Sequence, residues 1–196
     1  MLTPTRRMNF SNGIVDYGCC CRPEFIGRSF SLRRFWASIR ERTLILLAYR
    51  HGLRASEVCA LRLAEVDMKD GILSIQRLKG SLRTAQPLYE HRGQPLLDEV
   101  SALRSWLKVR PGDGSDYLFT SQKGGRMDRT QFFRIFQAVA ESAGLPAEKR
   151  HPHILKHTLA SHLVAGNVNL ALVKQALGHR SISNTMVYIG TTDACW

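Results

Sequence analysis

His153 and Lys156 lie three residues apart, directly after Pro152. Proline favours the first turn of a helix, because its missing N–H would have no partner there, so this stretch predicts a helix N-terminus. Residues three apart share one face of a helix, and the amides at that end attract anions. The pair can therefore hold a phosphate. The alternative is a capped helix with solvated side chains, since isolated pairs of this kind are common on protein surfaces.

Four more polar residues stand in short, well-defined segments. Arg54 lies in a predicted tight corner, and Lys79 in a basic loop between two predicted strands. His179 follows a leucine and a glycine, and Tyr188 comes nine positions later. The alternative for Tyr188 is a packed aromatic residue in a terminal helix.

Helical periodicity begins near residue 31. From Ser31 to Arg40 apolar residues recur at helical spacing, with arginines elsewhere around the helix, which predicts an amphipathic helix with a basic face. The alternative is a core helix with a solvated rim. Both interpretations predict a helix at this position and the same fold. A buried helix follows and ends at Gly52, where glycine permits a left-handed cap. Ser56 is expected to cap the next short helix, Glu57–Leu61.

Two alternating segments, Gly71–Gln76 and Thr84–Tyr89, predict antiparallel strands joined by the basic loop 77–83. Later helices are predicted at Leu96–Val109, Asp128–Ala143, His153–Ala165, Leu170–Leu177 and Ser183–Ile189. Residues 1–28 lack either periodicity and predict a loosely ordered N-terminal extension. The fold class is mainly α with a small antiparallel β-sheet, or α+β.

The chain carries a strong positive charge. Its 196 residues include 28 Lys and Arg against 16 Asp and Glu, a net charge of +12. Arginine dominates the basic residues and is favoured where a planar donor meets phosphate. The excess is spread along the chain, whereas membrane-surface binding usually concentrates charge on one amphipathic helix. Nucleic acid is the expected partner, and a merely soluble basic protein is the alternative.

The five cysteines are odd in number, and Cys19–Cys21 are adjacent, so the sequence predicts no disulfide framework. Adjacent cysteines also lack the spacer of a zinc knuckle. The N-terminus has no apolar signal-peptide core, and no apolar stretch is long enough to span a bilayer. We therefore expect a reducing, cytoplasmic setting.

Together these segments resemble the tyrosine recombinase, or phage integrase, family. The resemblance covers roughly residues 40–190. It rests on Arg54, Lys79, the His153-x-x-Lys156 pair, the Leu177-Gly178-His179 turn and Tyr188. It implies the catalytic-domain fold of a site-specific recombinase that breaks and rejoins double-stranded DNA, with no metal and no other cofactor. The implied partners are other protomers on the DNA. The resemblance implies neither a membrane partner nor a small-molecule substrate.

The resemblance also implies roles. Tyr188 would attack the scissile phosphodiester and form a 3′-phosphotyrosyl bond, while Arg54, Lys156 and His179 would surround the phosphate. Lys79 would protonate the leaving 5′ oxygen, or simply contact a phosphate. His153 would act as general base or hold a phosphate oxygen. Arg83 and Arg129 are expected to contact DNA.

The sequence departs from the family at three points. Lys156 replaces the family's arginine, which keeps the charge and loses the bidentate fork. We expect a catalytic domain at 29–196, without the DNA-clamping domain that precedes it in full-length integrases. The segment after Tyr188 is shorter than the tail that relatives donate to a neighbouring protomer, so ring assembly is not predicted.

These departures leave a noncatalytic or weakly active DNA-binding remnant of an integrase as the alternative function. A zinc hydrolase is a third interpretation, with His151, His153, His157 and His162 as its ligands. It lacks a glutamate beside the paired histidines, as such enzymes require.

Overall fold

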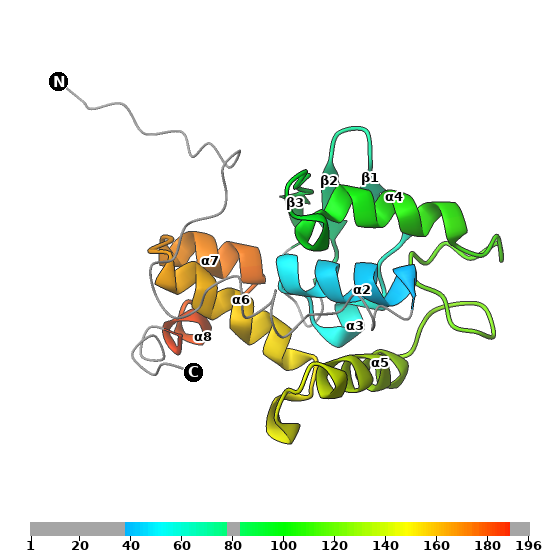
Figure 1. Cartoon of the computed structure of the whole chain (residues 1–196). Helices are drawn as coiled ribbons and strands as arrows, with labels where there is room; N and C mark the ends of the chain where they lie inside the picture. The colour runs from blue at the N-terminus through cyan, green and yellow to red at the C-terminus, as the bar shows by residue number, and fades with distance from the viewer. Residues whose placement is uncertain (1–37, 78–82, 189–196) are drawn as a thin grey trace.

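The computed structural model describes residues 38–77 and 83–188, which form a mainly helical structure with a small antiparallel sheet (Figure 1). The α-helices are α2 (Ile39–Arg50), α3 (Ala55–Val58), α4 (Glu99–Val109), α5 (Arg129–Ser142), α6 (His153–Ala165), α7 (Leu170–Leu177) and α8 (Ser183–Met186). The strands are β1 (Val66–Asp67), β2 (Ile72–Ile75) and β3 (Thr84–Pro87). Short 3-10 helices are η3 (Leu63–Glu65), η4 (Pro95–Leu97) and η5 (Ala147–Lys149).

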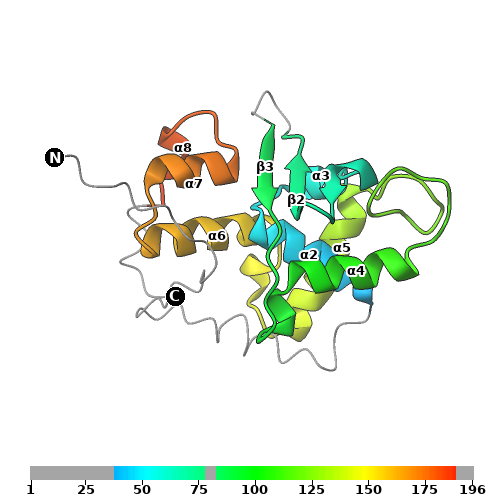
Figure 2. The same cartoon turned by 90° about the horizontal axis from the view of Figure 1, so that it is seen from above.

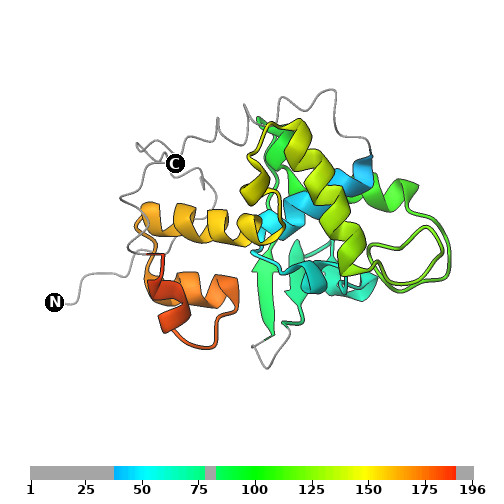
Figure 3. The ribbon, with the colours of Figure 1, turned by 90° about the horizontal axis from the view of Figure 1, so that it is seen from below.

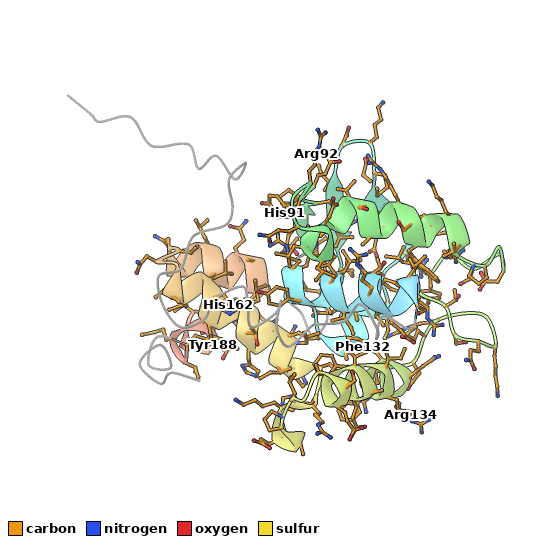
Figure 4. All side chains as sticks on the ribbon, in the orientation of Figure 1. His91, Arg92, Phe132, Arg134, His162 and Tyr188 are labelled. Atoms are coloured by element: carbon orange, nitrogen blue, oxygen red, sulfur yellow. The ribbon has the colours of Figure 1, made fainter. Side chains whose placement is uncertain are left out.

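Helix α2 lies at the centre of the larger hydrophobic core. The Ser38 hydroxyl caps it by accepting a hydrogen bond from the Glu41 amide at 3.2 Å. Residues 43–48 are all buried, as expected of a helix covered on several sides. In Figure 1 it lies between α4 and α5, and Figure 3 shows α5 crossing it from below. Figure 4 shows that α5 turns Phe132 toward this core and Arg134 away from it.

The sheet has the strand order β1-β2-β3, with both pairs antiparallel. Ile75 pairs with Thr84 next to the connecting loop, so β2 and β3 form the predicted hairpin. Leu73 and Ile75 are buried while Ile72 is exposed, in keeping with the alternation of side chains along a strand. Strand β1 was not predicted, because two residues are too short to show a period.

Helices α6, α7 and α8 pack together beside the sheet, with α7 facing β3 (Figure 2). Leu155, in the first turn of α6, belongs to the larger core around α2. A second, smaller core lies farther along α6 and contains Ala160, Val173, Leu177 and Tyr188. The polypeptide after Gly178 therefore depends on α6 and α7 for its position.

Some predicted boundaries were wrong. Helix α3 begins at Ala55, so Ser56 lies inside it, and the Glu57 carboxylate caps it by accepting a hydrogen bond from the Arg54 amide at 2.9 Å. Helix α6 ends at Ala165 as predicted, with Gly166 as its C-cap, and the left-handed residue that follows is Asn167, with φ of 54°. The predicted extension at 1–28, most of the predicted helix 31–40, and Lys79 lie outside the described residues.

Candidate active site

Arg54 follows a turn that glycine makes possible. Gly52 has φ of +56°, a conformation that other residues rarely adopt, and a Cβ there would come within 2.9 Å of the Leu177 side chain, so glycine favours both the turn and its close packing on the end of α7. This close approach brings the Arg54 corner to the C-terminal end of α7. The Arg54 guanidinium donates to Glu57 Oε1 at 2.7 Å and stays partly exposed.

Glu57 stands between two guanidinium groups. Its Oε2 atom accepts a hydrogen bond from Arg77 Nη1 at 3.1 Å, and both side chains are fully buried. Burial raises the pKa of the Glu57 carboxyl, but the Arg54 amide and the Arg77 charge outweigh burial and hold this pKa below its usual value. The site thus has a buried carboxylate that orients Arg54. The sequence signal for it was the first-turn glutamate of α3.

Lys156 is buried, with 6% of its surface exposed, whereas His153 is exposed. The prediction that the two share an open, anion-binding face of the helix was therefore wrong. Its ammonium donates to the carbonyl of Leu177 at 2.6 Å. Burial, followed by the charges of Arg54 and Arg77, lowers the pKa of Lys156 to about 7. The lysine therefore lies among other cations and is poised to lose its proton near neutral pH.

His179 is held beyond the left-handed Gly178, which ends α7 with φ of 64°. Its Nδ1 atom lies 3.0 Å from the hydroxyl of the buried Thr185 on α8. Burial lowers the pKa of His179 to about 4, helped by the charges of Lys156, Arg54 and Arg77. At neutral pH the ring is uncharged and can bind an oxygen through one N–H.

Tyr188 packs into the second core with 8% of its surface exposed, near α6 and α8 (Figure 4). Its ring is stacked on His179 with a centroid distance of 6.5 Å, and its hydroxyl lies 3.0 Å from His157 Nδ1. Burial raises the pKa of Tyr188, and the charge of Arg54 opposes this rise. His157 was not among the residues predicted for a recombinase site, only among the candidate zinc ligands; its place one turn along α6 from His153 was the available signal.

The remaining predicted residues lie around this group. His153 is exposed, and its ring centroid is 6.5 Å from that of His151. Arg83 and Arg129 are exposed at the start of β3 and of α5. Arg54, Lys156, His179 and Tyr188 are thus brought together, and Lys79 belongs to the connection that lies outside the described residues.

The arrangement suits an anion that accepts hydrogen bonds from several donors beside a tyrosine hydroxyl. Within residues 38–77 and 83–188, no three His, Cys, Asp or Glu side chains are grouped to hold a metal ion. Over the same part of the chain, every helix is too short or too polar to cross a membrane.

The phage integrase family model matches residues 31–194 of this sequence. The chain belongs to the phage integrase family. The type 1 fimbriae regulatory protein FimB of Escherichia coli strain K12 is 38% identical over 152 residues, which make up 76% of this chain and 72% of FimB.

Two solved recombinases share the fold of this integrase domain. The crystal structure of the XerA recombinase aligns with a TM-score of 0.72 and 25% identity, over 85% of this chain and 58% of XerA. The XerH site-specific recombinase bound to difH substrate aligns with a TM-score of 0.69 and 26% identity, over 85% and 48%. The chain thus spans about half the length of these two proteins. The predicted family and fold class are confirmed, while the 29–196 boundary and the residue roles stay predictions.

The buried Glu57 carboxylate makes the first prediction for this integrase domain. Glu57→Gln removes the negative charge between Arg54 and a fully buried Arg77, and breaking such a pair typically costs about 3–5 kcal/mol. Equilibrium unfolding in urea measures the loss. Glu141→Gln is the control, because its pair with Arg150 is largely exposed and should contribute less than about 1 kcal/mol. Equal losses in the two variants would contradict this account.

Proposed function

We propose that this integrase domain breaks and rejoins DNA strands by transesterification at Tyr188. The tyrosine oxygen attacks the scissile phosphorus, and the bond from phosphorus to the 5′ oxygen breaks. The products are a 3′-phosphotyrosyl bond and a 5′ hydroxyl, which has gained a proton. The reverse attack by a 5′ hydroxyl rejoins the strand, because the covalent bond conserves the energy of the broken ester.

One observation supports this proposal above the others: Tyr188 lies beside Arg54 and His179, side chains that can donate hydrogen bonds to a phosphate. Arg54 is close enough to influence the pKa of Tyr188, and His179 stacks on its ring. Lys156 is also close to Arg54 and His179: the Arg54 charge lowers the pKa of Lys156, and the Lys156 charge lowers the pKa of His179. Preorganised donors of this kind stabilise the charge on nonbridging phosphate oxygens in the transition state. The recombinases XerA and XerH share the fold, and XerH has been seen bound to difH substrate.

His157 is the proposed acceptor of the Tyr188 proton. Its Nδ1 atom lies 3.0 Å from the hydroxyl, within the reach that a general base requires. Burial, followed by the neighbouring His153, lowers the pKa of His157, so the ring is neutral and able to accept a proton at neutral pH. We propose Lys79 as the acid for the 5′ oxygen, and His153 as a phosphate contact beside His157.

Covalent capture of DNA tests the proposed function. The full chain is incubated with a nicked suicide duplex in the presence of EDTA, and the mixture is separated under denaturing conditions. A protein–DNA adduct that survives denaturation is the expected result, because the short 5′ product diffuses away and rejoining stops. If the protein binds the duplex but forms no adduct, it is a DNA-binding remnant of an integrase.

Duplex DNA is the proposed partner, and Arg83 and Arg129 are proposed phosphate contacts. The logarithm of the binding constant should fall by about 0.9 per neutralised phosphate for each unit of log salt. Fluorescence anisotropy in a salt series should show a slope smaller by about 1 for Arg83→Ala and for Arg129→Ala. Arg92→Ala is the control, because Glu90 lies 3.5 Å from Arg92 and offsets its charge. Unchanged slopes in the first two variants would remove these arginines from the interface.

A further inference from the structure

Arg77 is a buried guanidinium at the base of the β2–β3 hairpin, with 2% of its surface exposed. A guanidinium has five N–H donors, and the structure provides an acceptor for each of them. Nε donates to Thr84 Oγ1 at 3.3 Å. Nη1 donates to the Gly52 carbonyl at 3.2 Å and to Glu57 at 3.1 Å. Nη2 donates to the carbonyls of His51 at 2.9 Å and Ala176 at 2.7 Å.

These acceptors come from both sides of the candidate site. The carbonyls of residues 51 and 52 and the Glu57 carboxylate belong to the corner that carries Arg54. Ala176 lies in the last turn of α7, directly before the turn that carries His179. The same carbonyl of Ala176 also accepts a hydrogen bond from Gln86 Nε2 on β3 at 2.8 Å. Arg77 therefore connects the two segments that must meet at one phosphate.

Gly178 extends this contact to the backbone beyond α7. A Cβ built on Gly178 would lie 2.8 Å from Arg77 Nε and 2.9 Å from its Cδ, so the chain here passes directly over the arginine side chain. The Lys156 ammonium binds the carbonyl of the preceding residue, Leu177. A shift of Arg77 would thus move the supports of Lys156 and His179 together.

We propose that Arg77 is a positioning residue, which holds the Arg54 corner and the His179 turn at a fixed separation and makes no contact with DNA. All of its donors are already used within the protein, so none is left for a phosphate. Lysine could not replace it, because an ammonium has three donors at one point and cannot reach acceptors on the turn after α2, on α3, on β3 and on α7. The effect of Arg77 on DNA cleavage rests on the proposed function. Its role in holding the Arg54 corner and the His179 turn together does not.

An NMR titration of the histidine rings tests this role without DNA. In the starting protein the pKa of His179 is about 4, and in Arg77→Met it should rise toward its ordinary value near 6.5, because a charge is lost and the turn loosens. His162 is the internal control, since burial lowers its pKa and its ring nitrogen is hydrogen-bonded to Tyr49 on α2. An unchanged His179 in a folded Arg77→Met protein overturns the proposal, whatever the chain does to DNA.

Cleavage provides a second readout once the starting protein is seen to form the adduct. Arg77→Met and Arg77→Lys should each lower the single-turnover rate by about 10²-fold, the scale expected of a 1 Å misplacement. Their affinity for duplex DNA should stay within about 3-fold, because Arg77 has no donor free for phosphate. A loss of affinity as large as the loss of rate would make Arg77 a DNA contact and overturn the proposal.

Gly178→Ala keeps the arginine and is the variant of choice if Arg77→Met does not fold. Gly144→Ala is its matched control, because both glycines have positive φ, 64° and 74°, but a Cβ at 144 meets no atom within 4 Å. Both variants carry the backbone cost of alanine in the left-handed region. Only Gly178→Ala should raise the pKa of His179 and slow adduct formation. Equal behaviour of the two variants overturns the proposal.

Discussion

Tyr188→Phe is expected to abolish the covalent adduct with DNA while leaving DNA binding nearly intact. The substitution removes the proposed nucleophilic oxygen and keeps the ring that packs against α6 and α7. It also removes the hydrogen bond to His157, which contributes only about 1 kcal/mol to the free energy of unfolding. The variant should therefore fold, bind duplex DNA and form no product that survives denaturation.

Tyr49→Phe is a matched control within the same chain. Its hydroxyl lies 2.8 Å from Nδ1 of His162, so the variant loses a similar tyrosine–histidine hydrogen bond on the same helix α6. Adduct formation should persist in Tyr49→Phe. Adduct in the Tyr188→Phe variant at the level of the starting protein would show that Tyr188 is not the nucleophile.

Lys156→Ala is expected to lower the rate of adduct formation at least ~10²-fold, the usual loss for one transition-state donor. The ammonium lies beside Arg54 and Arg77 and is anchored on the Leu177 carbonyl, so alanine removes both a charge and this anchor. Single-turnover cleavage with the suicide duplex measures the loss. Equal rates in the variant and the starting protein would place Lys156 away from the reacting phosphate and favour a noncatalytic DNA-binding role.

Lys156→Arg should keep or raise the rate, and its advantage should grow with pH. The pKa of Lys156 is about 7 in the free protein, so the lysine loses its proton as pH rises, whereas arginine stays charged. A bound phosphate raises this pKa, which moves the change to higher pH. The ratio of the two cleavage rates, measured from pH 6 to about 9, isolates this effect from other titrating groups. A ratio independent of pH would mean that Lys156 keeps its proton throughout.

The same lowered pKa affects folding. The unfolded chain holds the Lys156 proton up to about 10.5, while the folded protein releases it near 7. Between these values the unfolded state binds more protons, so the contribution of Lys156 to the free energy of unfolding increases with pH. Below about 7 both states are protonated, and the cost of burying the charge is present in full.

Regular elements of this fold were predictable from local patterns. Helix α6 and helix α7 begin and end where the periodicity and the flanking Pro152 and Gly178 indicated. The hairpin of β2 and β3 followed from alternation alone. These features depend on neighbouring residues in the sequence, and a single chain carries that information.

The environment of each site residue was not predictable. Helical spacing put His153 and Lys156 on one face, but α7 covers Lys156 and leaves His153 exposed. Arg77 was predicted only as part of a basic loop, yet its acceptors lie as far as 99 positions away along the chain. Such contacts arise from packing between elements, and no local pattern encodes which arginine becomes buried.

The connection between α7 and the rest of the site has a consequence for how sequences of this kind can vary. Arg77 and Gln86 both bind the main-chain carbonyl of Ala176, an atom that every amino acid carries. A saturation mutagenesis library should therefore tolerate many side chains at position 176, which is only partly buried, and few at 77 and 86. Selection would act on one side of each hydrogen bond, so the contact would leave no pairwise covariation, although both of its partners are close in space.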